Sequence, residues 1–134
     1  MGASKPINKV NAEQAKEFEE QILYWRDVLG LHRWRIERGQ RPAKDAMASV
    51  EFNDDAKLVT YRLGDFGATE INHKSLSMTA LHEVLHVFLH ELVVVAQAKG
   101  VDPVELEAVE HSAINVLESV LFKALYGSCK QNKG

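Results

Sequence analysis

The sequence predicts an α+β fold in which a helix and a small sheet precede two long helices. Three observations support this order. Apolar residues recur at helical spacing between positions 11 and 30, short alternating runs follow between 34 and 63, and two long apolar stretches occupy 77–98 and 103–126. A spacing of three or four residues is typical of a helix packed on one face, and strict alternation is typical of a strand.

The length of the chain, 134 residues, is sufficient for one domain with its own apolar core. We expect a single domain over 1–134, with an ordered core at about 11–126 and short flexible tails. A hydrophobic fraction of 46% and a charged fraction of 26% are ordinary for a soluble globular protein. The single cysteine, Cys129, excludes an internal disulfide and fits a reducing cytosol.

The net charge of -3 and the pI near 6.1 give no electrostatic signature of a nucleic-acid-binding or membrane-binding protein. The N-terminus lacks the apolar core of a secretory signal, and no uninterrupted apolar stretch has the length of a spanning helix. We therefore expect a cytoplasmic protein without a membrane partner. One stretch is basic, which we interpret as solvated surface: Arg26, Arg33, Arg35, Arg38, Arg41 and Lys44.

The first helix has a clear start and stop. Asn11 followed three residues later by Gln14 is a capping-box pattern, and Gly30 is placed to end the helix. The apolar stripe between them has helical spacing and should face the core. It consists of Ala15, Phe18, Ile22, Trp25 and Leu29.

The sheet should contain three or four short strands. Alternation predicts one strand at 34–36, a second at 46–52 and a third at 57–63. The turn residues at 53–55 join the last two strands into a hairpin. A further short edge strand is expected at 69–72.

The two long helices differ in their surroundings. The stretch 77–98 is apolar on nearly every side, which predicts a helix buried at the centre of the domain. Asp102 and Pro103 form a cap and a first-position proline, so a final helix should start there and reach about Tyr126.

The run His82-Glu83-Val84-Leu85-His86 predicts a metal site. Residues four apart on a helix share one face, so two imidazoles can reach one zinc ion at ~2.0–2.1 Å. Glu83 lies ~100° further round the helix. There it can act as general base toward a zinc-bound water. The alternative is a pair of ordinary core histidines, but buried polar groups are costly without partners, and an ion supplies one.

A catalytic zinc usually has three protein ligands, and Glu110 is the expected third. On the last helix Glu110 falls inside an apolar arc, where a carboxylate needs a compensating charge. The arc comprises Leu106, Val109, Ala113, Ile114, Leu117, Val120, Leu121 and Ala124. Glu107 at the edge of this arc and His111 outside it are the alternatives. His111 also suits an oxyanion-stabilising or supporting role near the site.

These motifs resemble those of the glutamate zincins (gluzincins), and most closely the compact phage and prophage metallopeptidases and minigluzincins. Those are relatives of the ImmA/IrrE-like and SprT-like groups. The resemblance covers roughly residues 11–126 and is carried by HEVLH and the later helix VELEAVEHSAINVLESVL. It implies a zincin-like fold, Zn²⁺ held by His82, His86 and Glu110, and Glu83 as general base. It also implies the cytoplasm of a bacterium or of a phage-infected host cell. The long third-histidine motif of metzincins is missing.

Several other residues could contribute. His90 continues the spacing of the two motif histidines and suits a supporting role or a plain core position better than a third helical ligand. His73 could line a cleft, although an ordinary loop position is the simpler interpretation. Tyr61 and Tyr126 are candidate transition-state donors by analogy with zincins. No separate organic cofactor is expected.

The leading functional hypothesis is a zinc metallopeptidase that hydrolyses peptide bonds in a peptide or protein substrate, held by strand addition near 69–72. One alternative is a zinc hydrolase of another bond, such as an RNA phosphodiester or a non-peptide amide; the acidic charge balance disfavours RNA. The other is a non-catalytic zinc-containing binding module, in which Glu83 would have no use. No feature of the sequence specifies an oligomeric state.

Overall fold

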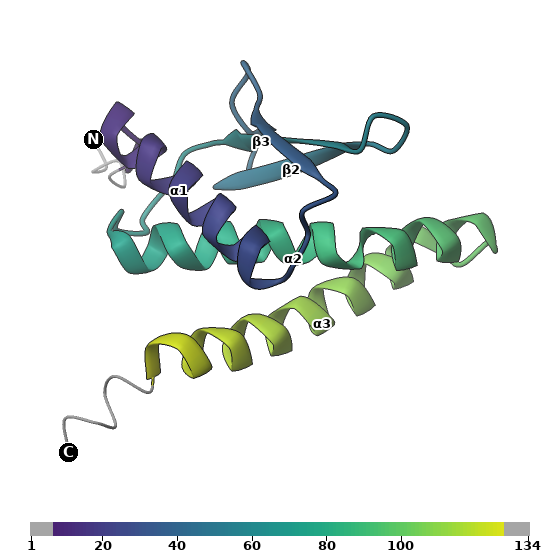
Figure 1. Cartoon of the computed structure of the whole chain (residues 1–134). Helices are drawn as coiled ribbons and strands as arrows, with labels where there is room; N and C mark the ends of the chain where they lie inside the picture. Colours follow the sequence, from purple (N-terminus) through teal and green to yellow (C-terminus); the bar gives the residue numbers. More distant parts are fainter. Residues whose placement is uncertain (1–6, 128–134) are drawn as a thin grey trace, which may run out of the picture. The chain divides into compact units, whose positions relative to one another are not determined.

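The computed structural model describes residues 7–127 and confirms the α+β fold class (Figure 1). Its elements are α1 (Ala12–Val28), β1 (Arg35–Arg38), β2 (Ala48–Asn53), β3 (Leu58–Leu63), α2 (His73–Ala98), α3 (Pro103–Phe122) and a closing π-helical turn, η1 (Lys123–Gly127). Most of the predicted flexible tails, with Cys129, lie outside the described residues. Residues 7–10 are described, and the Asn8 side chain donates a hydrogen bond to the Thr69 carbonyl oxygen at 2.7 Å.

The chain divides into two compact units, Met1–Val84 and Leu85–Gly134. The boundary falls inside α2, which continues across it as one helix. The first unit contains α1, the sheet and the first half of α2. The second contains the other half of α2 and α3. That the whole chain forms one domain stays a prediction.

Helix α1 is built as its sequence predicts. The Asn11 side chain accepts a hydrogen bond from the Gln14 backbone N–H at 2.8 Å, and the Gln14 side chain accepts one from the Asn11 N–H at 3.0 Å, which completes a capping box. Phe18 and Trp25 are fully buried, with Ala15 and Ile22 beside them in the stripe. Gly30 has a φ of +68°, the left-handed conformation in which helices commonly end.

The sheet has three strands in the order β1-β3-β2. β2 and β3 pair antiparallel as the predicted hairpin, with Val50 opposite Tyr61, and β1 pairs parallel with β3. All the observed strand ends lie within two residues of the predicted ends. The central strand buries every second residue, Val59, Tyr61 and Leu63, as expected for a strand with one face on a core.

The expected strand at 69–72 is wrong, because this segment is a loop that leads into α2. Asn72 instead caps the helix. Its side-chain oxygen accepts a hydrogen bond from the Ser75 N–H, and the Ser75 hydroxyl accepts one from the Asn72 N–H, both at 2.9 Å. This reciprocal cap starts α2 at His73, four residues before the predicted start at residue 77.

The first half of α2 lies in the core of the first unit. Ala80 and Leu81 are fully buried, as predicted, and so is Leu76, just before the predicted start of the helix. The indole N–H of Trp25 lies 3.1 Å from both the carbonyl oxygen and the hydroxyl of Ser77, so α1 holds the early turns of α2 (Figure 1). The Phe18 ring packs 5.6 Å from that of Tyr61, which links α1 to the sheet as well.

Beyond Val87 the helix leaves the core, and its predicted burial on nearly every side is wrong there. Phe88, Leu92 and Val95 are all exposed. These residues follow Val84, where the first unit with its packed core ends. Within the described chain, α2 alone has the length and apolar composition of a membrane-crossing helix, a criterion that the core helix of a soluble protein also meets.

Helix α3 starts at the predicted cap, where the Asp102 side chain accepts a hydrogen bond from the Glu105 N–H at 3.2 Å. With the turn η1 it reaches Gly127, close to the predicted end at Tyr126. Its predicted apolar arc is covered on one side only. Ile114 is fully buried, whereas Val109 and Val120 are largely exposed.

The contact between Trp25 and Ser77 gives a test of how α2 is held. Trp25→Phe removes the indole N–H and part of a fully buried ring, leaving a cavity and losing its hydrogen bond to Ser77. We expect a loss of about 2–3 kcal/mol in the free energy of unfolding, measured by urea denaturation. Tyr24→Phe, at the exposed neighbouring position, is the control and should change stability by less than about 0.5 kcal/mol. Equal effects of the two changes would contradict this assignment.

Candidate metal centre

Helix α2 places His82 and His86 one turn apart on the same face, as the sequence predicts. Both side chains are half-buried. Glu83, between them in sequence, is buried, with only 6% of its surface exposed. An apolar helix therefore carries two imidazoles and a carboxylate within a single turn, in a region where such groups are costly unless they have partners.

Within the second unit, His86 has a partner on α3. Its Nδ1 lies 2.8 Å from Oε2 of Glu110 on α3, and these side chains are only 18% and 15% exposed. When this carboxylate is ionised it can only accept a hydrogen bond, and Nδ1 is then the nitrogen that donates. The other ring nitrogen, Nε2, is then left with its lone pair available to an ion.

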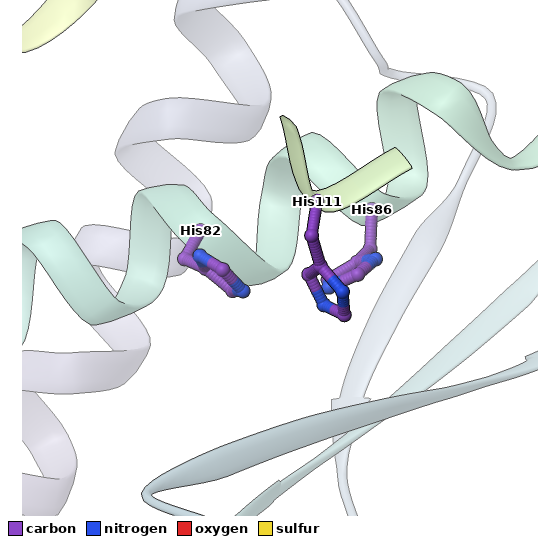
Figure 2. A group of neighbouring side chains, drawn as sticks. All are labelled: His82, His86 and His111. Carbon is purple, nitrogen blue, oxygen red and sulfur yellow. The ribbon is translucent and has the colours of Figure 1, made fainter. Parts of the chain in front are cut away.

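His111, the residue after Glu110, also lies beside His86. The two rings are perpendicular, with their centroids 5.2 Å apart. One ligand atom from each of His82, His86 and His111 lies within 4.8 Å of the others, and the three rings lie on one side of α2 (Figure 2). Two nitrogens on one zinc ion are separated by at most about twice the bond length of ~2.1 Å. Small ring rotations would therefore bring all three nitrogens to an ion.

The chemistry of this donor set fits a divalent zinc ion. Neutral imidazole nitrogen is a preferred zinc ligand, and three protein ligands with an open position are typical of catalytic zinc sites. A carboxylate that accepts a hydrogen bond from the second nitrogen of a ligating histidine is the usual support for such a ligand. Glu110 and His86 have that relation. The structure thus contains a histidine cluster that could bind a metal ion.

For the third metal ligand, the sequence and the structure point to different residues. The structure brings His111 into the cluster and places Glu110 against His86. The assignment of Glu110 as a ligand stays a prediction. The covered side of α3 is centred on Ile114, and at ~100° per residue Glu110 and His111 flank it on opposite sides. The predicted apolar arc excludes His111 because it includes Val109 and Val120, which the structure exposes.

The other candidate residues lie outside this cluster. His90 is half-buried one turn beyond His86, and Glu107 is exposed on α3. The Nδ1 atom of His73 lies 2.8 Å from a carboxylate oxygen of Glu17, so this exposed histidine belongs to a surface pair between α2 and α1.

Tyr61 is a buried residue of the first unit. Its hydroxyl donates a hydrogen bond to the Glu19 carboxylate at 3.1 Å, and its side chain is almost fully buried. Burial raises the pKa of Tyr61 well above its usual range, and the neighbouring Glu19 carboxylate raises it further. A phenol in this position stays protonated and holds α1 to β3. The side chain of Tyr126 falls outside the described part of the chain.

The chain was compared with protein-family models, with curated proteins and with solved structures, and none of them matches it.

The cluster predicts tight binding of one zinc ion. His82→Ala, His86→Ala and His111→Ala should each weaken zinc binding by more than about 100-fold, because loss of a ligand should exceed the roughly 10–100-fold effect of losing a supporting group. Competition with a chromophoric chelator measures the affinity. His73→Ala is the matched control, since it removes a histidine from α2 outside the cluster, and it should bind zinc like the wild type. Equal zinc affinity in all four variants would rule out the cluster as the binding site.

Proposed function

We propose that this chain is a zinc metallopeptidase in which His82, His86 and His111 hold the ion and Glu83 is the general base. The observation that carries the proposal is the buried carboxylate of Glu83, placed directly after one cluster histidine on the same helix. A closed structural zinc site has no need for such a group, whereas hydrolysis requires a base beside the metal.

A divalent ion, when bound, supplies Lewis acidity and an activated water at the open position. The remaining chemistry belongs to the protein. Glu83 accepts the proton of the attacking water and returns it to the leaving amine, which is the ordinary function of a general base that later acts as an acid. Because Glu83 is almost entirely covered by protein, little bulk water competes for its hydrogen bonds.

Glu110 acts in this proposal through His86. Its carboxylate fixes the ring orientation and keeps the proton on Nδ1, so that Nε2 is presented for metal binding. The pair is largely shielded from solvent, which strengthens a charge-assisted hydrogen bond. Glu110 is therefore a positioning residue, and the order Glu110-His111 places a supporting group and a ligand side by side on α3.

The proposed substrate is an extended peptide within the cytoplasm. The resemblance of HEVLH to the motif of gluzincins supports peptide hydrolysis. Since the segment 69–72 is a loop, strand addition would use an edge of the sheet instead. β2 forms one edge, pairing with β3 alone among the described residues, and it belongs to the same unit as His82 and Glu83. An unpaired row of backbone N–H and C=O groups can hold a substrate backbone.

Glu83→Gln tests the catalytic role directly. The amide keeps the size of the side chain but cannot accept the proton, so we expect hydrolysis of a fluorescently labelled unfolded protein to fall by roughly 100-fold or more. Zinc content, measured by atomic absorption, should remain that of the wild type. Glu91→Gln, an exposed position two turns further along α2, is the control and should keep full activity. Unchanged hydrolysis in Glu83→Gln, or no hydrolysis by zinc-loaded wild type, would contradict the proposal.

A second comparison separates the two roles assigned on α3. If Glu110 positions His86, Glu110→Gln should weaken zinc binding by roughly 10–100-fold and His111→Ala by more. If Glu110 is itself the third ligand, the order reverses, and Glu110→Gln should lose zinc as completely as His82→Ala. Chelator competition on the three variants distinguishes these outcomes, with circular dichroism to verify that each is folded.

A further inference from the structure

Helix α3 carries an exposed apolar stripe that the metal centre does not use. The stripe, called here the valine stripe, consists of the exposed Val109, Val116 and Val120 and the half-buried Ala113. Its three valines are 61%, 61% and 58% exposed in chain order. β-Branched apolar side chains at such exposure lose the stabilisation that burial would give, so a contiguous row of them marks a surface that another molecule covers.

The stripe lies on a distinct side of the helix. At ~100° per residue its four members fall within an arc of about 60°. The centre of that arc is about 170° from His111 and about 130° from Ile114. A surface contact on the stripe therefore leaves the cluster side of α3 unchanged.

The spacing of the stripe indicates that its partner is a helix. Successive members are separated by four, three and four residues, which is the repeat of a coiled-coil seam. Ser112 and Ser119 border the seam on one side. Such small side chains allow a second helix to approach closely.

Charge and symmetry identify the partner as a second copy of this chain, running antiparallel. About a two-fold axis between positions 114 and 115, Val109 faces Val120 of the other copy and Ala113 faces Val116. Glu105 and Lys123 are both exposed and lie on the same side of the helix, about five turns apart. The antiparallel pairing places each Glu105 beside a Lys123, whereas a parallel pairing would bring like charges together.

We propose that α3 forms an antiparallel homodimer through the valine stripe, closed at both ends by Glu105–Lys123 pairs. The same patch is used on both copies, as a two-fold interface requires. The proposed interface extends from Glu105 to Lys123, which is about 27 Å along one helix. This is at the small end of specific interfaces, so the dimer should dissociate on dilution. The proposal does not depend on zinc or on the reaction.

The oligomeric state of the full chain tests the stripe. Sedimentation velocity over a range of concentrations should show a reversible monomer–dimer equilibrium. Val116→Glu places a charge at the centre of the seam and should give a monomer throughout that range. Val104→Glu is the matched control, since Val104 is 76% exposed on the same helix but about 150° from the stripe centre, and it should dimerise like the wild type. Circular dichroism verifies folding of both variants.

Cross-linking tests the antiparallel direction. In a Cys129→Ser background, Glu105→Cys and Lys123→Cys are prepared separately and then mixed under mild oxidation. The mixture should yield a disulfide between the two different variants, while each variant alone should yield little, because a disulfide requires Cα atoms within about 7 Å. Efficient self-linking of Glu105→Cys would indicate a parallel pair, and a wild type that stays monomeric at every concentration would indicate another occupant. Either result overturns the proposal.

Discussion

The contact between His86 and Glu110 is the interaction on which the arrangement of polar groups in the second unit depends. An imidazole and a carboxylate that are both largely removed from water must find partners, or the cost of desolvation would favour another packing of the helices. At 2.8 Å they satisfy each other. The same bond fixes which ring nitrogen carries the proton, so a feature that stabilises the helix pair also prepares one nitrogen for an ion. The hydrogen bond that stabilises the helix pair would thus also support a metal ion at the cluster.

The packed core of the first unit holds the part of α2 that carries His82 and Glu83. Trp25 anchors the early turns of α2 through Ser77, and Phe18 connects α1 to Tyr61 of the central strand. His82 and Glu83 follow on the same helix within two turns, so their backbone positions are set by a packed core. In the proposed roles of metal ligand and general base, side chains on such a rigid helix would lose little conformational freedom. Helix α2 then continues into the second unit, where many of its apolar residues beyond Val87 are exposed.

Most of the fold was predictable because local signals and burial agree there. The capping box at Asn11, the stripe ending at Gly30, the hairpin and the cap at Asp102 each have a short-range physical cause, and each is confirmed. The prediction was wrong where the same residues can fit either of two structural environments. Residues 69–72 could form an edge strand, but the reciprocal cap of Asn72 and Ser75 starts a helix instead. The valines of α3 could be core, but Val109 and Val120 are largely exposed.

The sequence by itself determined that His82, Glu83 and His86 share one turn of a helix, because spacing along a helix depends on local backbone geometry alone. It also determined that Glu110 and His111 lie on the following helix. How these two residues meet His86 was decided only by tertiary structure, since the rotation of one helix against another depends on side chains distant in the chain. That rotation places Glu110 on His86 Nδ1 and His111 beside the ring, and leaves the valine stripe exposed.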